Sequence, residues 1–171
     1  NENNAVVTRD FQDNATQTWV IKRAAATPPP PPAPTLNGVF TIQQLSSRLF
    51  LDGWVTADRG YDVVTRDFQP NSTQRWILKP LGSNRYTIRH QTNGRYLDAW
   101  VDGNYHVVTR DEQRNNTQVW LIKPLGNNRY TLQQASNGRY MDAYQSVNDN
   151  TVMTRKARGN AQQQWIIQRV K

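Results

Sequence analysis

Short stretches in which apolar and polar residues alternate recur along most of this chain. Residues 86–90 alternate and are rich in strand-forming side chains, and residues 95–98, 107–110 and 119–123 have the same character. Alternation with a period of two is typical of a β-strand with one buried face. Polar turn residues separate these stretches, and no window carries a sustained helical spacing. The pattern therefore predicts an all-β chain built from short strands.

The strongest signal is a segment that begins Val-Val-Thr-Arg and ends Gln-x-Trp. In each copy the arginine precedes the glutamine by eight residues. The last three glutamines, Gln74, Gln118 and Gln163, lie 44 and 45 residues apart. A fixed period of this kind indicates repeated supersecondary units. The segment occurs at residues 6–19, 63–76, 107–120 and 152–165, the last copy with Met for the second Val.

Other features recur in step with this segment. The matching stretches are residues 84–88 with 128–132 and residues 93–100 with 137–144, with looser first copies at 38–42 and 47–54. Residues 37–171 therefore hold three complete repeats of four strands. A propeller also has four-stranded blades, but typically about four to eight of them. We therefore expect residues 36–171 to form a β-trefoil, three four-stranded repeats with pseudo-threefold symmetry.

The N-terminal part of the chain differs from these repeats. Residues 1–23 contain only the second half of a repeat, which we interpret as the remnant of a preceding trefoil. Residues 24–35 are proline-rich, a composition typical of an extended, semi-rigid linker. Because an isolated strand pair is marginally stable in water, we expect residues 1–23 to contact a preceding domain or a second chain.

Composition narrows the classes of function. The chain has no cysteine, which excludes disulfides, thiolate metal sites and cysteine catalysis. Its two histidines are too few and wrongly spaced for a metal site, and it has no Gly-rich phosphate loop. We therefore expect no catalytic residue, no metal and no cofactor. No run of about 18 apolar residues is present, so we expect no transmembrane segment.

The net charge leaves several partners open. It is +8, with an isoelectric point of about 10.1, in a chain that is 36% hydrophobic with a mean hydropathy of −0.83. An excess of Lys and Arg suits nucleic acid, acidic glycans or an anionic membrane, or serves only solubility. The cations are spread through the repeats without a block of five or six like charges. This spacing argues against a dedicated nucleic-acid groove.

Two repeated positions read as structural. The tryptophan of each Gln-x-Trp lies on the last strand of its repeat, where three large rings would fill the interior. These residues are Trp76, Trp120 and Trp165. We expect the adjacent glutamines to bond loop backbone groups that would otherwise be buried without partners. Asn93-Gly94 predicts a type I′ hairpin turn ahead of residues 95–98.

An aspartate, an aromatic residue and an arginine also recur together. The aromatic residue lies two positions after the aspartate, so the two side chains share one face of a strand. One interpretation is a structural Asp–Arg pair. The other is a sugar site, in which Asp accepts from hydroxyls, Arg donates and the ring stacks on a pyranose, with Tyr61, Tyr105 and His106 around the same pocket. The candidates are Asp52, Trp54 and Arg66; Asp98, Trp100 and Arg110; and Asp142, Tyr144 and Arg155.

Three repeats of this length, each ending in Gln-x-Trp after an aspartate-bearing hairpin, resemble the ricin B-type lectin family. The resemblance covers residues 36–171 and, in part, 1–23. It implies a carbohydrate-binding β-trefoil in which the aspartate accepts hydrogen bonds from a sugar that stacks on an aromatic platform. The aspartate is retained at Asp52, Asp98 and Asp142, whereas the platform position holds Arg66, Arg110 and Arg155.

The resemblance favours a non-catalytic lectin module with up to three weak glycan sites. We expect it to target a larger, secreted toxin or hydrolase to glycans on cell surfaces or glycoproteins. Two alternatives remain: a structural or protein-interaction trefoil without a sugar site, and a basic module that binds acidic glycans.

Overall fold

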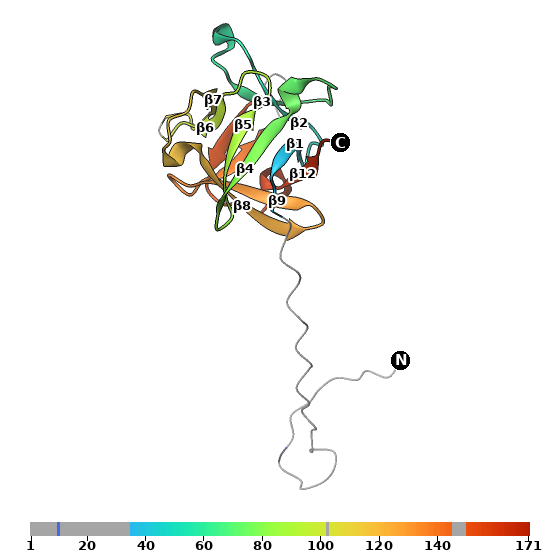
Figure 1. Ribbon diagram of the computed structural model, residues 1–171. Helices are drawn as coiled ribbons and strands as arrows, with labels where there is room; N and C mark the ends of the chain where they lie inside the picture. The colour runs from blue at the N-terminus through green and yellow to red at the C-terminus, as the bar shows by residue number, and fades with distance from the viewer. Residues whose placement is uncertain (1–9, 11–34, 102, 145–149) are drawn as a thin grey trace. The chain divides into compact units, whose positions relative to one another are not determined.

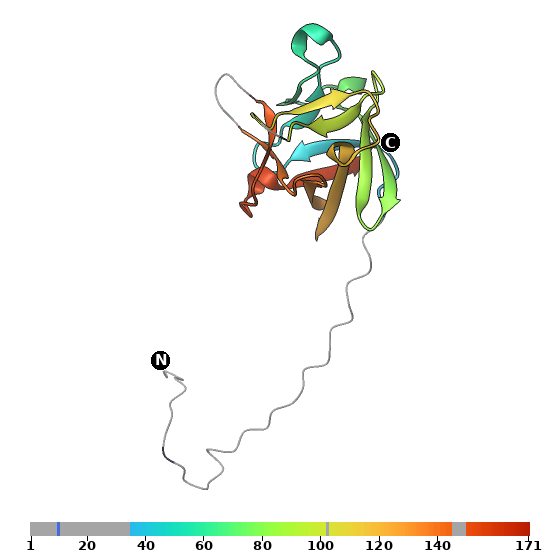
Figure 2. The same ribbon diagram turned by 90° about the vertical axis from the view of Figure 1, so that its left-hand side faces the viewer.

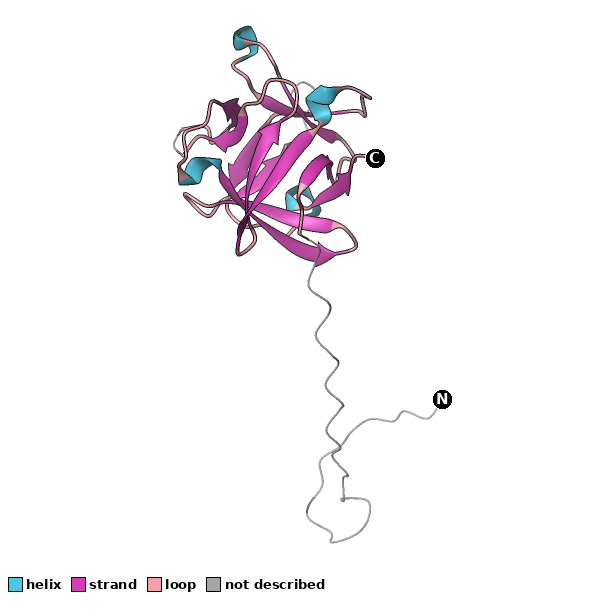
Figure 3. Ribbon diagram, in the orientation of Figure 1, coloured by secondary structure: helices cyan, strands magenta, loops and turns pink. Residues whose placement is uncertain are grey.

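The computed structural model describes residue 10 and residues 35–101, 103–144 and 150–171. The predictions for residues 1–23 and for the linker 24–35 lie outside the described residues, apart from Asp10 and Thr35. The described chain is all-β, as predicted, and the helical parts are single 3₁₀ turns in loops (Figure 3). These turns are η2 (Ala57–Arg59), η3 (Ser72–Gln74), η4 (Asn116–Gln118) and η5 (Ala161–Gln163).

Twelve strands form one continuous sheet in the described residues. Each predicted repeat supplies four of them, which confirms the β-trefoil. The first repeat has β1 (Gly38–Gln44), β2 (Phe50–Gly53), β3 (Val63–Arg66) and β4 (Trp76–Gly82). The second has β5 (Arg85–His90), β6 (Tyr96–Ala99), β7 (Val107–Arg110) and β8 (Val119–Gly126), and the third has β9 (Arg129–Gln134), β10 (Tyr140–Ala143), β11 (Val152–Arg155) and β12 (Trp165–Arg169).

The first and last strands of the repeats close into a six-stranded barrel. β1 pairs with β4 and β12, β5 pairs with β4 and β8, and β9 pairs with β8 and β12 (Figures 1 and 2). The middle strands form three antiparallel hairpins, β2–β3, β6–β7 and β10–β11. Bridges between hairpins link Asp62 with Val108, Val64 with Thr151 and His106 with Met153. The three hairpins therefore meet one another around the pseudo-threefold axis.

The Gln-x-Trp tryptophans lie in the core, as predicted. Trp76, Trp120 and Trp165 are fully buried. Each indole N–H donates to the backbone carbonyl of the residue just before the repeated aspartate, at 3.0, 3.0 and 3.1 Å. Because the polar end of the ring is satisfied, the large apolar surface is buried without an unpaired donor. The last strand of each repeat thereby fixes the strand that bears the aspartate.

The glutamines bond loop backbone groups, which confirms the second structural prediction. Gln118 Oε1 accepts from Gln113 N at 2.8 Å, and its Nε2 donates to the Asp111 carbonyl at 2.8 Å. Gln74 and Gln163 make the same two bonds in their repeats. Each glutamine therefore closes the loop between the third strand of its repeat and the Gln-x-Trp strand.

The hairpin predicted at Asn93-Gly94 joins β5 and β6, but the predicted type I′ turn was wrong. Gly94 has φ +71°, but Asn93 does not take the left-handed φ that a type I′ turn needs at both positions. The Asn93 side chain instead accepts from Arg95 N at 3.1 Å and bonds the His90 ring at 3.0 Å. Two-residue turns with left-handed φ at both positions occur at Ser83-Asn84 and Asn127-Asn128, where β4 meets β5 and β8 meets β9.

Candidate functional site

The pairing of the hairpin strands brings each aspartate, arginine and aromatic residue together. In β2–β3, Asp52 lies opposite Val64, and Phe50 lies opposite Arg66. Asp52 and Arg66 are therefore diagonal neighbours on one face of the hairpin. The β6–β7 and β10–β11 hairpins have the same register. We call each set an Asp–Arg–aromatic unit: unit 1 is Asp52, Arg66 and Trp54, unit 2 is Asp98, Arg110 and Trp100, and unit 3 is Asp142, Arg155 and Tyr144.

The aspartates form the floor of these units. Asp52 and Asp98 are fully buried, and Asp142 is 1% exposed. The Arg66 and Arg110 guanidinium groups approach their aspartates at 3.7 and 3.9 Å. Each aspartate keeps at least one buried carboxylate oxygen without a hydrogen-bond partner, and Asp98 keeps both. Buried carboxylates are normally paired, so these oxygens remain available as acceptors. In units 1 and 2 the arginine side chain lies beside them.

The arginines lie over the aromatic rings. The Cζ atom of Arg66 is 3.8 Å from the Trp54 ring centroid, and that of Arg110 is 3.7 Å from the Trp100 centroid. A guanidinium at such a distance is attracted by the ring quadrupole. The two arginine side chains remain 28% and 23% exposed. Each guanidinium is therefore held between a buried anion and a ring, and its side chain remains partly exposed.

The three aromatic rings differ in how far they are open. A second guanidinium, that of Arg59, lies 4.9 Å from the Trp54 centroid, and Trp54 is only partly exposed. Trp100 carries one guanidinium and is 46% exposed, next to Val101 at 47%. Tyr144 is 50% exposed. Unit 2 therefore combines a paired arginine with the more accessible indole surface.

Unit 3 departs from the other two. The Arg155 Cζ atom lies 5.6 Å from the Tyr144 centroid, and its Nε donates to the Met153 sulfur at 3.0 Å. Thioether sulfur is a weak acceptor. Within the described ranges, no ion pair joins Arg155 to Asp142 at 4.0 Å or less. The guanidinium of this unit is consequently less neutralised than those of Arg66 and Arg110.

A second set of arginine–aromatic stacks joins neighbouring repeats. Arg95 lies 3.9 Å from the centroid of Tyr61, and Arg139 lies 3.7 Å from that of Tyr105. The tyrosines therefore contact the arginine of the next repeat, rather than a pocket of their own repeat as we expected. Sequence reasoning missed both arginines, although each follows the repeated Asn-Gly of its hairpin.

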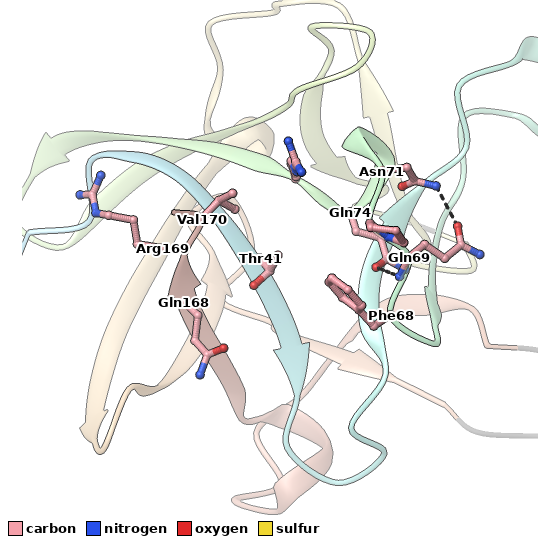
Figure 4. Close-up of a pocket in the computed structure, with 10 residues that line it drawn as sticks. Thr41, Phe68, Gln69, Asn71, Gln74, Gln168, Arg169 and Val170 are labelled. Carbon is pink, nitrogen blue, oxygen red and sulfur yellow. Dashed lines mark hydrogen bonds between the residues drawn. The ribbon is translucent and has the colours of Figure 1, made fainter.

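Two of the shallow hollows on the described surface are lined by residues of different repeats. One, of about 200 Å³, lies between Thr41, Gln168, Arg169 and Val170 on one side and the 68–75 loop on the other (Figure 4). Phe68, which is 61% exposed, points into it. The other hollow has a volume of about 630 Å³ and is lined by residues of the second and third repeats. Its lining residues are Asn104, Tyr105, Arg139 and residues 153–158.

The described part of the chain lacks two further kinds of feature. No group of three or more His, Asp or Glu side chains is arranged there to hold a metal ion. None of its helical segments has the length and apolar character needed to cross a membrane.

Solved structures share this architecture. The designed threefold-symmetric protein ThreeFoil aligns at 22% identity and a TM-score of 0.70, over 78% of this chain and 100% of that one. A mosquitocidal holotoxin aligns at 18% identity and 0.71, over 80% of this chain but 18% of its own. A Polyporus squamosus lectin aligns at 18% identity and 0.66, over 78% and 49%. At these identities the likeness concerns the fold.

Sequence comparison adds the family. A search of curated proteins finds no match. The ricin-type β-trefoil lectin domain-like family, in contrast, matches over residues 15–110, 72–154 and 116–171, which together include most of the chain. The chain has three complete repeats that end in Gln-x-Trp, and the first and last strands of these repeats form its barrel. It belongs to the ricin-type β-trefoil lectin domain-like family.

Proposed function

We propose that this chain is a carbohydrate-binding module whose sugar contacts are made by the Asp–Arg–aromatic units. The observation that carries the proposal is unit 2, where the exposed Trp100 ring lies against Arg110 above the buried Asp98. A pyranose presents an apolar face and a rim of hydroxyl groups. An indole surface and a guanidinium edge match these two features, because the ring stacks on carbon and the guanidinium donates to oxygen.

The aspartate would act mainly through the arginine. Asp98 is buried beneath Arg110, so a sugar hydroxyl reaches its carboxylate only if the arginine moves aside. With the arginine in place, the carboxylate holds the guanidinium over the ring and limits the entropy lost on binding. Asp52 would have the same role in unit 1, whereas Asp142 makes no ion pair with Arg155 among the described residues. The sugar contacts would then fall to Trp54, Trp100 and Tyr144 with their arginines.

Up to three such sites would act together. Each is shallow and would bind weakly, but sites on one rigid trefoil raise avidity without new contacts. Unit 1 would contribute least stacking, because two guanidinium groups already lie over the Trp54 ring. Units 2 and 3 keep Trp100 and Tyr144 about half exposed. This difference supports a ranking of the sites, with unit 2 ahead of unit 1.

The module would direct a larger, secreted protein to glycans. Its fold occurs as part of longer chains: it aligns with 18% of a mosquitocidal holotoxin and 30% of an exo-beta-1,3-galactanase from Clostridium thermocellum. The Polyporus squamosus lectin was solved with Neu5Aca2-6Galb1-4GlcNAc, and the protein SeviL with the asialo-GM1 saccharide. By this analogy, the chain is a non-catalytic targeting domain of a toxin or hydrolase.

A glycan array tests the proposal. The wild-type chain should bind a defined set of glycans. A Trp100→Ala/Tyr144→Ala variant should lose most of that binding, because both exposed stacking surfaces are gone. A triple Asp52→Asn/Asp98→Asn/Asp142→Asn variant should also bind more weakly, because Arg66 and Arg110 are no longer anchored. Thermal unfolding of each variant shows whether the fold persists, and a folded variant with undiminished binding would refute the site.

The alternative is a structural or protein-interaction trefoil. The Asp–Arg contacts favour it, because a buried pair of this kind also holds a loop in place without any ligand. A wild-type chain that binds no glycan on the array, while its folded state is confirmed by circular dichroism, would establish this alternative over the lectin.

A further inference from the structure

The 630 Å³ hollow between the second and third repeats concentrates positive charge. Four of the side chains that line it are cations, Arg139, Arg155, Lys156 and Arg158, and none of its lining residues is an acid. Lys156 and Arg158 are exposed, and Arg139 and Arg155 are partly exposed. None of the four makes a salt bridge within the described residues. Like charges gathered in one concavity create a field that attracts an anion.

The corresponding surface of the second repeat is neutralised. There Asp111 occupies the position of Lys156, and Gln113 occupies that of Arg158, counted from the repeated Gln-x-Trp. Asp111 Oδ1 accepts from Arg95 Nη1 at 2.8 Å, and Arg95 is the counterpart of Arg139. The third repeat therefore lacks the acid that satisfies this arginine and carries two additional cations. Threefold packing does not require this change, because the second repeat forms the same hairpin without it.

The arginine of the hollow is held in place although it lacks an anion. Arg139 Nε and Nη2 donate to the Thr154 carbonyl at 3.1 and 2.8 Å, and its guanidinium lies 3.7 Å from the Tyr105 centroid. The Thr154 N–H in turn donates to the Tyr105 carbonyl at 2.9 Å. Arg139 therefore needs little ordering before it binds a ligand, which favours affinity.

We propose that this hollow binds the carboxylate or sulfate group of an acidic glycan. Arg139 and Arg155 would form charge-assisted hydrogen bonds with the anion, and Lys156 and Arg158 would close around it. Tyr105 and Met153 would contact the apolar part of the sugar ring. A volume of about 630 Å³ lies in the range of small-molecule sites. The inference rests on the proposed function, which it deepens by naming the class of sugar.

A glycan suits this hollow better than a nucleic acid does. A protein that binds nucleic acid usually places a stripe of Lys and Arg along the phosphate backbone over several positions. The cations of the third repeat do not continue in this way, because the matched positions of the second repeat carry Asp111 and Glu112. A single acidic group on a sugar requires only the one cluster.

The test compares matched saccharides and charge-matched variants. The probes are N-acetyllactosamine and its 6-sulfated and sialylated forms, with a DNA oligonucleotide in a separate titration. Lys156→Asp/Arg158→Gln copies the second repeat into the hollow. Lys79→Asp/Lys123→Gln makes the same change in net charge on exposed positions of β4 and β8. The wild type should bind at least one acidic form about tenfold more tightly than the neutral one, the scale of one charged hydrogen bond.

The Lys156→Asp/Arg158→Gln variant should lose this preference, and the control variant should keep it. Equal losses in both variants would overturn the proposal, because they would indicate non-specific attraction, and so would DNA binding that depends on Lys156 and Arg158. Binding of neutral N-acetyllactosamine distinguishes failure of the acidic site from failure of the proposed lectin function. If the wild type binds it as tightly as the acidic forms, the acidic site is refuted while the lectin proposal stands. If no saccharide binds, the proposed function fails as well.

Discussion

Arg110→Met should destabilise the trefoil, because it leaves the Asp98 carboxylate buried without its cation. Asp98 is 0% exposed, and Arg110 Nη1 at 3.9 Å is the cation that pairs with it. Removing one partner of a fully buried pair costs about 3–5 kcal/mol. Since the Arg110 side chain is 23% exposed, water weakens the pair, and we expect a loss of about 2–3 kcal/mol in the free energy of unfolding. The melting temperature should fall by roughly 6–9 °C.

A double-mutant cycle with Asp98→Asn isolates this interaction. Asn has the shape of Asp without the charge, so the double variant Asp98→Asn/Arg110→Met contains no unpaired buried ion. Urea unfolding should find it more stable than the sum of the single losses predicts, by about 1–2 kcal/mol. Losses that add within about 0.5 kcal/mol would refute the buried pair as an energetic unit. An Arg110→Met loss below that value would have the same meaning.

Three further predictions concern the core, a loop and ligand binding. A Cβ atom on Gly53 would meet His90 Nε2 at 3.1 Å, so Gly53→Ala should lower the free energy of unfolding by about 1–3 kcal/mol. Adding His90→Gln should restore part of that stability. Losses that simply add in urea unfolding would count against this contact. Gln118→Leu removes two loop hydrogen bonds and should lower the free energy of unfolding in urea by about 2–4 kcal/mol. An unchanged unfolding midpoint would mean that other contacts hold the loop. The dissociation constant of a neutral glycan, measured by calorimetry, should change less than about twofold between 50 and 500 mM salt, because salt screens stacking and neutral hydrogen bonds little. A steep loss of affinity with salt would indicate ionic binding.

Much of the fold follows from the spacing of the repeats. Four alternating stretches per repeat specify four strands, and the recurring Gln-x-Trp marks the strand whose ring fills the core. The type of the turn at Asn93-Gly94 was predicted wrongly, because asparagine can support a turn with its side chain as well as with a left-handed backbone. The pairing of Gly53 with His90 was also missed. It is a contact between repeats, where a smaller residue faces a ring, and no local pattern records it.

The candidate site was only partly accessible from the sequence. Spacing on one strand placed Asp98 and Trp100 together, and repetition suggested that Arg110 accompanies them. The burial of the aspartates depends on how the hairpins pack against the barrel, so the sequence could not distinguish an open acceptor from a covered one. The stacks of Arg95 on Tyr61 and Arg139 on Tyr105 join neighbouring repeats. They became visible only when threefold packing brought those segments together.

A sugar that stacks on the exposed indole of the second repeat should change the magnetic environment of Trp100. Titration of ¹⁵N-labelled protein with a glycan identified on the array tests this stacking through the indole N–H resonances. The Trp100 resonance should shift progressively, whereas the resonances of Trp76, Trp120 and Trp165, which are fully buried, should stay in place. Saturable glycan binding that leaves the Trp100 resonance unmoved would show that the sugar binds elsewhere, and so would shifts confined to the core tryptophans.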